Sequence, residues 1–181
     1  MSTEASRDPD IEPDTKDWTW VLERACPECG YDARSVSGAD VASRVRTNAD
    51  AWPPVLARPD ARIRPRVGVW SPLEYACHVR DVHRVFGERV RSMLVHDDPL
   101  FDNWDQDEAA LLGAYGRQDP ASVARELVAA ATDVAELYGS VGPDEWDRPG
   151  RRSNGSVFTT LTIARYHLHD VEHHLVDVSG G

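Results

Sequence analysis

The sequence predicts an all-α protein: a four-helix bundle with a long crossover connection, preceded by an irregular extension that contains tryptophans and cysteines. Four segments repeat apolar residues at alternating spacings of three and four, the pattern of a helix with one face on a core. A long acidic stretch, 96–118, separates the second segment from the third and suits a crossover better than a helical hairpin. No segment has the length and alternation of a convincing strand.

Composition narrows the class of protein. The chain has 181 residues, 31 acidic and 20 basic, and a net charge of −11, which argues against nucleic acid or an anionic membrane as the main partner. The polar first residues contain no signal-peptide apolar run, and no apolar run approaches a membrane span. Three cysteines do not suggest a disulfide scaffold. We therefore expect a cytoplasmic protein, and its lysine-poor, arginine-rich composition is typical of a high-GC bacterial source.

The chain divides into an extension and a bundle. Residues 1–36 form an N-terminal tail and extension, and residues 37–181 form the bundle. Within the extension, residues 1–16 are polar and expected to be disordered or loosely attached. Trp18 and Trp20 alternate with polar residues, so we expect that piece to lie extended against the body.

Two cysteines of the extension form half of a zinc knuckle. Cys26-Pro-Glu-Cys29-Gly has the spacing, and Cys26 and Cys29 are a candidate for a separate structural metal site. Structural zinc normally takes four ligands, however, and the chain has no second CxxC; Cys77 is its only other thiol. A tight turn that happens to hold two thiols is therefore the favoured interpretation.

The first two helices have recognisable starts. Ser37 or Asp40 caps a helix that runs to about Leu56, with a bend or end at the two prolines before it. Ser71 is the N-cap of the second helix, a proline follows at the first helical position, and Glu74 completes a capping box. These caps fix where the two helices enter the bundle.

The second half of the chain supplies the other two helices. The acidic connection holds a short helix at about 107–115, and Asp119 followed by proline restarts a helix that runs to about Tyr138. Residues 139–155 are expected to be loop. The fourth helix is expected from near Ser156 to Val178.

The fourth helix is rich in histidine. On a helical wheel, His167 and His174 flank the apolar stripe with Asp170 just beyond, whereas His169 and His173 fall toward solvent. Asp170 and His174, one turn apart, border the core and could hold one ion. A solvated helix end, where histidine suits the helix dipole, is the alternative interpretation.

His78 lies on the inner face of the second helix, where a bundle builds its sites from facing side chains. A satisfied core histidine is the simpler interpretation of this residue alone. Together with Asp170 and His174, however, His78 gives two imidazoles and one carboxylate. That set suits zinc with an open fourth position, or a divalent iron or nickel ion.

The motif Trp70-Ser-Pro-Leu-Glu74 with His78, followed by Asp170, His174 and Asp177, resembles the DinB-like superfamily of metal-binding four-helix bundles. That superfamily includes bacillithiol and mycothiol S-transferases and the metal-binding domain of mycothiol-dependent maleylpyruvate isomerase. The resemblance covers roughly residues 37–178.

The isomerase-like members use His, Glu and His as ligands, with an Asp three residues after the last. His78, Asp170, His174 and Asp177 match that order, with Asp170 in place of Glu. Aspartate is one methylene shorter. If its carboxylate does not reach the ion, His169 and His173 are the alternative ligands.

The resemblance implies a function. The ion would bind a low-molecular-weight thiol such as mycothiol and favour its thiolate, which attacks an electrophilic small molecule. Asp177 would orient a ligand imidazole, and His167 could serve catalysis as a proton shuttle. Arginines of 58–66 or 148–152 would bind polar groups of the thiol. The alternatives are a hydrolase that activates water, a non-catalytic binding or stress-response module, and a homodimer compatible with each of these.

Overall fold

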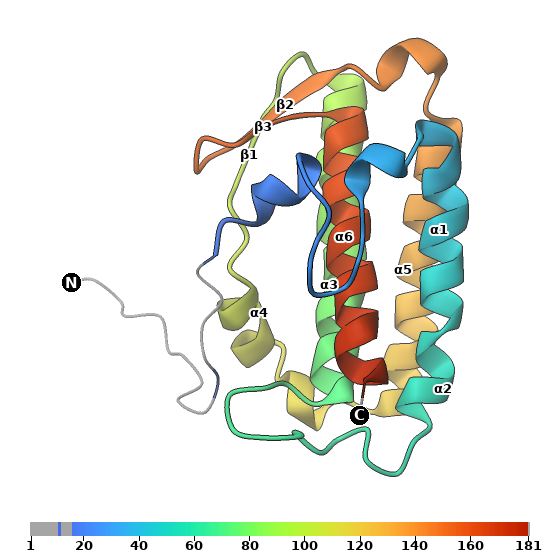
Figure 1. Cartoon of the computed structure of the whole chain (residues 1–181), viewed down its shortest axis with the longest axis vertical. Helices are drawn as coiled ribbons and strands as arrows, with labels where there is room; N and C mark the ends of the chain where they lie inside the picture. Colours follow the sequence, from blue (N-terminus) through green and yellow to red (C-terminus); the bar gives the residue numbers. More distant parts are fainter. Residues whose placement is uncertain (1–10, 12–15, 181) are drawn as a thin grey trace, which may run out of the picture.

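The computed structural model describes Ile11 and residues 16–180, and it confirms the all-α four-helix bundle (Figure 1). The bundle helices are α1 (Gly38–Asp50), α3 (Pro72–Val95), α5 (Pro120–Ser140) and α6 (Thr160–Ser179). A short helix, α2 (Trp52–Leu56), continues α1 after a bend where the predicted first helix meets its prolines. No helix in the described part of the chain is long and apolar enough to cross a membrane.

The chain links the four helices in an order that requires a crossover. α1 and α3 each pack against both α5 and α6, so they occupy opposite corners of the bundle. In Figure 1, α1 and α6 run downward, whereas α3 and α5 run upward. Because α3 and α5 are parallel neighbours, the chain between them must return along the length of the bundle. The predicted crossover is therefore confirmed.

That connection carries short elements that cover one side of α3. They are β1 (Leu100–Phe101), α4 (Gln106–Leu112) and the 3-10 turn η3 (Tyr115–Arg117). The observed α4 overlaps the short helix expected at 107–115, but it begins one residue earlier and ends at Leu112. Asp105 caps it by accepting hydrogen bonds from two backbone N–H groups of the first turn.

A small sheet was missed in the sequence. β1 pairs in parallel with β2 (Pro149–Arg152), which pairs antiparallel with β3 (Val157–Thr159). The expected loop at 139–155 is therefore wrong over β2, and α6 begins at Thr160 rather than near Ser156. Strands of two to four residues are too short for alternating polarity to be recognised.

The capping box predicted at the start of α3 is present, and its glutamate also binds an arginine of the preceding loop. Glu74 is only 6% exposed and accepts hydrogen bonds from the backbone N–H and hydroxyl of Ser71, both at 2.8 Å. The Arg64 guanidinium approaches the same carboxylate to 2.6 Å. One side chain thus caps α3 and holds the loop between α2 and α3.

Replacing Glu74 by alanine should lower the free energy of unfolding by about 2–3 kcal/mol, because a cap and the ion pair between Arg64 and Glu74 are lost. Urea unfolding at pH 7 measures this. Glu74→Gln keeps an acceptor for Ser71 without the charge, so it should cost about half as much. An alanine variant within about 0.5 kcal/mol of wild type would contradict the role of Glu74.

The N-terminal extension packs along α6 (Figure 1), through the 3-10 turns η1 (Trp18–Leu22) and η2 (Ala33–Ser35). The Tyr31 hydroxyl donates to the Arg165 carbonyl at 2.7 Å, and Arg165 in turn donates to the Val36 carbonyl. The expectation that the chain is extended at the tryptophans is wrong, because Asp17 caps a 3-10 turn there. The expectation for residues 1–16 lies outside the described residues, apart from Ile11 and Lys16.

Candidate metal centre

Three predicted ligands meet between α3 and α6. His78 comes from α3, and Asp170 and His174 come from successive turns of α6. Their ligand atoms lie within 4.8 Å of one another. The Oδ1 atom of Asp170 lies 3.1 Å from the His78 Nε2 atom and 3.7 Å from the His174 Nε2 atom. The shorter aspartate therefore reaches the two imidazoles.

The spacing of these atoms fits a metal ion. A tetrahedral ion with bonds of about 2.0–2.1 Å separates neighbouring nitrogen and oxygen ligands by about 3.3 Å, close to both observed distances. His78 is fully buried, and its Nδ1 atom has no hydrogen-bond partner among the described residues. The donors thus suit zinc, nickel or iron.

Asp177 fixes the orientation of His174. Its Oδ2 atom lies 3.0 Å from the His174 Nδ1 atom, so Nδ1–H donates to the carboxylate and the Nε2 lone pair faces Asp170. The Oδ1 atom of the same carboxylate lies 3.7 Å from the His173 Nε2 atom. The carboxylate that we expected to orient one ligand therefore contacts two imidazoles.

The site favours a charged carboxylate. Burial opposes ionisation of Asp170, but the charge and the hydrogen bond of His78, together with His174 and His167, hold the pKa of this carboxyl well below its usual value. Asp170 is therefore an anion across the physiological pH range. An anionic ligand between two imidazoles provides the charge that attracts a cation.

Asp170 and His174 line a cleft of about 580 Å³, and the fully buried His78 contacts Asp170 from α3. Trp70 and Trp104 contact the His78 ring at centroid distances of 5.4 and 5.5 Å and form an aromatic wall. Among the arginines expected to bind a substrate, Arg152 lines the cleft, whereas those of 58–66 do not. Arg89 also lines it and was missed, although it follows His78 by about three helical turns on the same face.

His167, expected to be catalytic, lies in the core and does not line this cleft. Its Nε2 atom lies 2.9 Å from the His83 Nδ1 atom, and its Nδ1 atom lies 2.9 Å from the Tyr138 hydroxyl. His83 is fully buried as well. The catalytic role of His167 stays a prediction, and these contacts favour a structural one.

Burial of this histidine pair makes stability depend on pH. Desolvation lowers the pKa of His167 to about 4 and holds that of His83 well below 6.5. Between about pH 6.5 and 4 the unfolded chain binds protons that the folded chain does not. The free energy of unfolding should therefore fall by about 3 kcal/mol for His167 across that window and be constant above it.

Urea unfolding at pH 7.5 and 5.0 measures this dependence, because carboxyl groups contribute little above pH 5. His83→Gln removes one of the two groups and should make the loss of stability on acidification smaller than in wild type. An equal loss in both proteins would contradict the assignment to this pair.

The prediction that His169 and His173 face solvent is wrong. They are only 4% and 8% exposed, because the extension packs over that side of α6. They do not join His78 as alternative ligands of the bundle ion; instead, they lie with Cys26 and Cys29. A helical wheel drawn for the bundle alone contains no information on the extension.

The remaining thiol is not a nucleophile. Cys77 is fully buried, and burial raises the pKa of its thiol to about 12. Its Sγ atom approaches the Tyr115 carbonyl oxygen at 3.8 Å rather than a base. Chemistry at the cleft therefore depends on the side chains around His78 and on what binds there.

A helical bundle with two imidazoles and a carboxylate on facing helices defines a class of protein able to hold a metal ion at its core. The chain belongs to the DinB superfamily, whose family model matches residues 43–176. Among solved structures, YfiT from Bacillus subtilis is similar, with a TM-score of 0.69 and 15% identity over 81% of this chain and 89% of that one. It is described as a probable metal-dependent hydrolase with an unusual four-helix bundle topology. No curated protein matches the chain.

Proposed function

We propose that this protein is a metal-dependent transferase in which His78, Asp170 and His174 hold a divalent ion, zinc above all, that activates a low-molecular-weight thiol for attack on an electrophilic small molecule. The observation that carries the proposal is that the ligand atoms of these three side chains lie within 4.8 Å of one another, beside the cleft that Asp170 and His174 line. Three protein ligands leave a coordination position for a thiol or water. A bound ion of this kind supplies Lewis acidity, which lowers the pKa of a coordinated thiol or water.

The chain's own residues have defined tasks in this proposal. The Nε2 atoms of both histidines and the Asp170 carboxylate bind the ion, and Asp177 keeps the His174 ring in the tautomer that coordination needs. Trp70 and Trp104 cover His78 and exclude water from that side.

Arginines in the cleft suit a polar thiol. Arg89 and Arg152 line the same cleft as Asp170 and His174. Their guanidinium groups are suitable donors to the carboxylate and hydroxyl groups that a cosubstrate such as mycothiol carries. Both arginines are predicted to affect the KM for the thiol more than the metal content.

A second candidate function is hydrolysis by an activated water on the same ligands. It is favoured by the fold shared with YfiT, which is described as a probable metal-dependent hydrolase. Binding of the ion would be the same in both cases, so the two differ in the nucleophile that occupies the open position.

Turnover measurements separate the two functions. The protein is loaded with zinc and incubated with an electrophile such as a chlorinated aromatic, with and without mycothiol, and with ester and amide substrates alone. Conjugation that requires the thiol and is lost in His78→Ala supports the transferase. Thiol-independent ester or amide cleavage lost in the same variant would support the hydrolase instead. Cys77→Ser is the control for the thiol of Cys77, the residue next to His78 in the sequence.

A further inference from the structure

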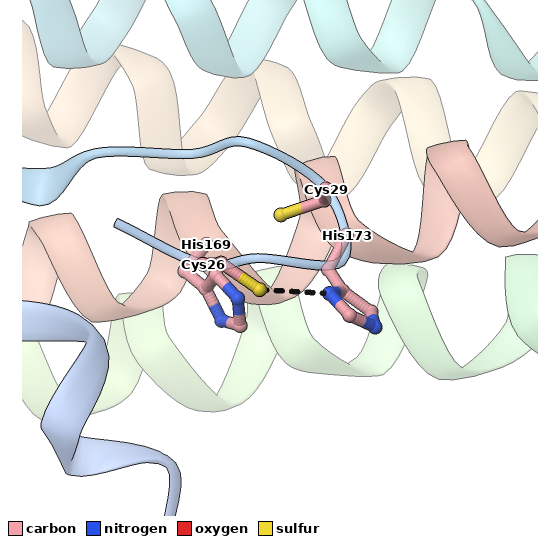
Figure 2. Close-up of side chains that lie close together, drawn as sticks. All are labelled: Cys26, Cys29, His169 and His173. Atoms are coloured by element: carbon pink, nitrogen blue, oxygen red, sulfur yellow. Dashed lines mark hydrogen bonds between the residues drawn. The ribbon is translucent and has the colours of Figure 1, made fainter. Parts of the chain in front are cut away.

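A second set of candidate ligands includes two histidines of α6, His169 and His173, which precede Asp170 and His174 by one residue each. Cys26 and Cys29, in the loop between η1 and η2, face His169 and His173 (Figure 2), and the four ligand atoms lie within 4.8 Å of one another. We propose that these side chains bind a structural zinc ion that fastens the N-terminal extension to α6. The site is separate from the bundle centre and does not depend on the function proposed above.

The donors match structural zinc in kind and in spacing. Two sulfurs and two imidazoles are a preferred tetrahedral set for this ion. Two residues separate Cys26 from Cys29 and three separate His169 from His173, both within the spacings of Cys2His2 sites. Four protein ligands complete the coordination, so no position is open for water or substrate. A structural role follows.

The cysteine loop and the helix already have a suitable separation. The Cys26 Sγ atom lies 3.8 Å from the His173 Nδ1 atom, and Figure 2 shows the two pointing toward one another. An ion bonded at about 2.3 Å to sulfur and about 2.0 Å to nitrogen at tetrahedral angles separates them by about 3.5 Å. The observed distance is therefore close to that between two ligands of one ion.

The two imidazoles have the surroundings of ligands. His169 is 4% exposed, and its Nε2 atom is buried with no hydrogen-bond partner among the described residues. The His173 Nε2 atom, on the far side of the ring from Cys26, lies 3.5 Å from Glu28 and 3.7 Å from Asp177. Carboxylates in this position orient metal-binding histidines.

The loop is shaped to present both sulfurs. The Cys26 N–H donates to the Tyr31 carbonyl, and the Gly30 N–H donates to the Cys26 carbonyl, both at 2.8 Å. Gly30 has a φ of +78°, a conformation that residues with a Cβ rarely adopt. The turn that carries both cysteines is therefore closed by backbone hydrogen bonds.

A zinc ion here would join distant parts of the chain, since Cys26 and His173 lie 147 residues apart in the sequence. Trp18 contacts the rings of His169 and His173 at centroid distances of 5.4 and 5.3 Å and also lines the cleft. The ion would therefore fix one wall of the cleft as well as the extension.

Cobalt substitution of the untagged full-length protein tests the site. Cobalt bound by thiolate gives a sulfur-to-metal charge-transfer absorption that the sulfur-free bundle centre cannot give. We expect this absorption in wild type and in His78→Ala, and its loss in Cys29→Ser. Cys77→Ser, which alters the thiol outside the cluster, should keep it. Zinc content should fall by about one equivalent in Cys29→Ser, and chelation should lower the Tm by about 5–10 °C.

Absence of the charge-transfer absorption from wild-type protein would overturn the proposal, even if the cysteine variant fails to fold. A Cys26–Cys29 disulfide in freshly purified protein, seen as the loss of two hydrogens in its mass, would also overturn it. A failed transferase assay would leave both readouts unchanged, since they do not measure turnover.

Discussion

His78→Ala should remove the ion of the bundle centre and reduce turnover by about a thousandfold or more. Among the described residues, His78 is the candidate ligand that α3 supplies, and it is fully buried, so water cannot replace its nitrogen easily. Loss of the ion's Lewis acidity is worth several kcal/mol in the transition state, and about 4 kcal/mol corresponds to a thousandfold. Elemental analysis and the rate of the zinc-loaded reaction measure the two effects.

Asp177→Asn should have a smaller effect on the bundle centre than His78→Ala. The amide keeps the shape of Asp177 but weakens its hold on the His174 Nδ1–H, so metal affinity should fall by about 10–100-fold while saturating metal restores binding. Asp170→Ala should resemble His78→Ala. If Asp170→Ala retained the bundle ion and His169→Ala lost it, the assignment of the ligands would be wrong.

Trp52→Ala should lower the free energy of unfolding by about 3–5 kcal/mol. The Trp52 side chain is fully buried at the bend between α1 and α2, and its removal leaves a large cavity. The indole Nε1–H also donates to the Asn48 Oδ1 atom at 3.2 Å, and the Asn48 amide donates to the Val171 carbonyl of α6 at 2.9 Å. The substitution therefore removes packing and one link of a buried chain of hydrogen bonds.

Two variants separate these contributions in urea unfolding. Trp52→Phe keeps most of the volume but leaves the Asn48 oxygen without its donor, and should cost about 1–3 kcal/mol. Asn48→Ala should cost a similar amount, because the Trp52 indole then loses its acceptor. If Trp52→Ala were no more destabilising than Trp52→Phe, the cavity would not be the main cause of the lost stability.

The helices could be predicted because their causes are local. Apolar spacing, the Ser71 capping box and the Asp119-Pro120 start each act within one or two turns, and α3 and α5 begin where these signals place them. The long acidic connection predicted the crossover, since parallel neighbours need a returning segment. The candidate ligands His78 on α3 and Asp170 and His174 on α6 lie on or beside the core-facing sides of their helices, so a helical wheel was sufficient to predict that they meet.

The remaining features depend on contacts between distant parts of the chain. β1 and β2 are too short to be recognised, and they pair only because the crossover and the chain before α6 meet. His169 and His173 were placed toward solvent because that side of α6 is polar in the bundle. The sequence contains both halves of the second candidate site: the pair Cys26 and Cys29, and the pair His169 and His173. Packing of the extension against α6 brings the two pairs together.

The carboxylate of Asp177 links the two candidate centres, with one oxygen near His174 and the other near His173. Coordination of an ion by either imidazole makes that ring more positive and strengthens its attraction for the Asp177 carboxylate. The position of the carboxylate relative to the other imidazole then changes as well. Occupancy of the two centres is therefore expected to be cooperative. Thermodynamic linkage requires reciprocity: the factor by which the first ion alters the affinity for the second equals the factor by which the second alters the affinity for the first.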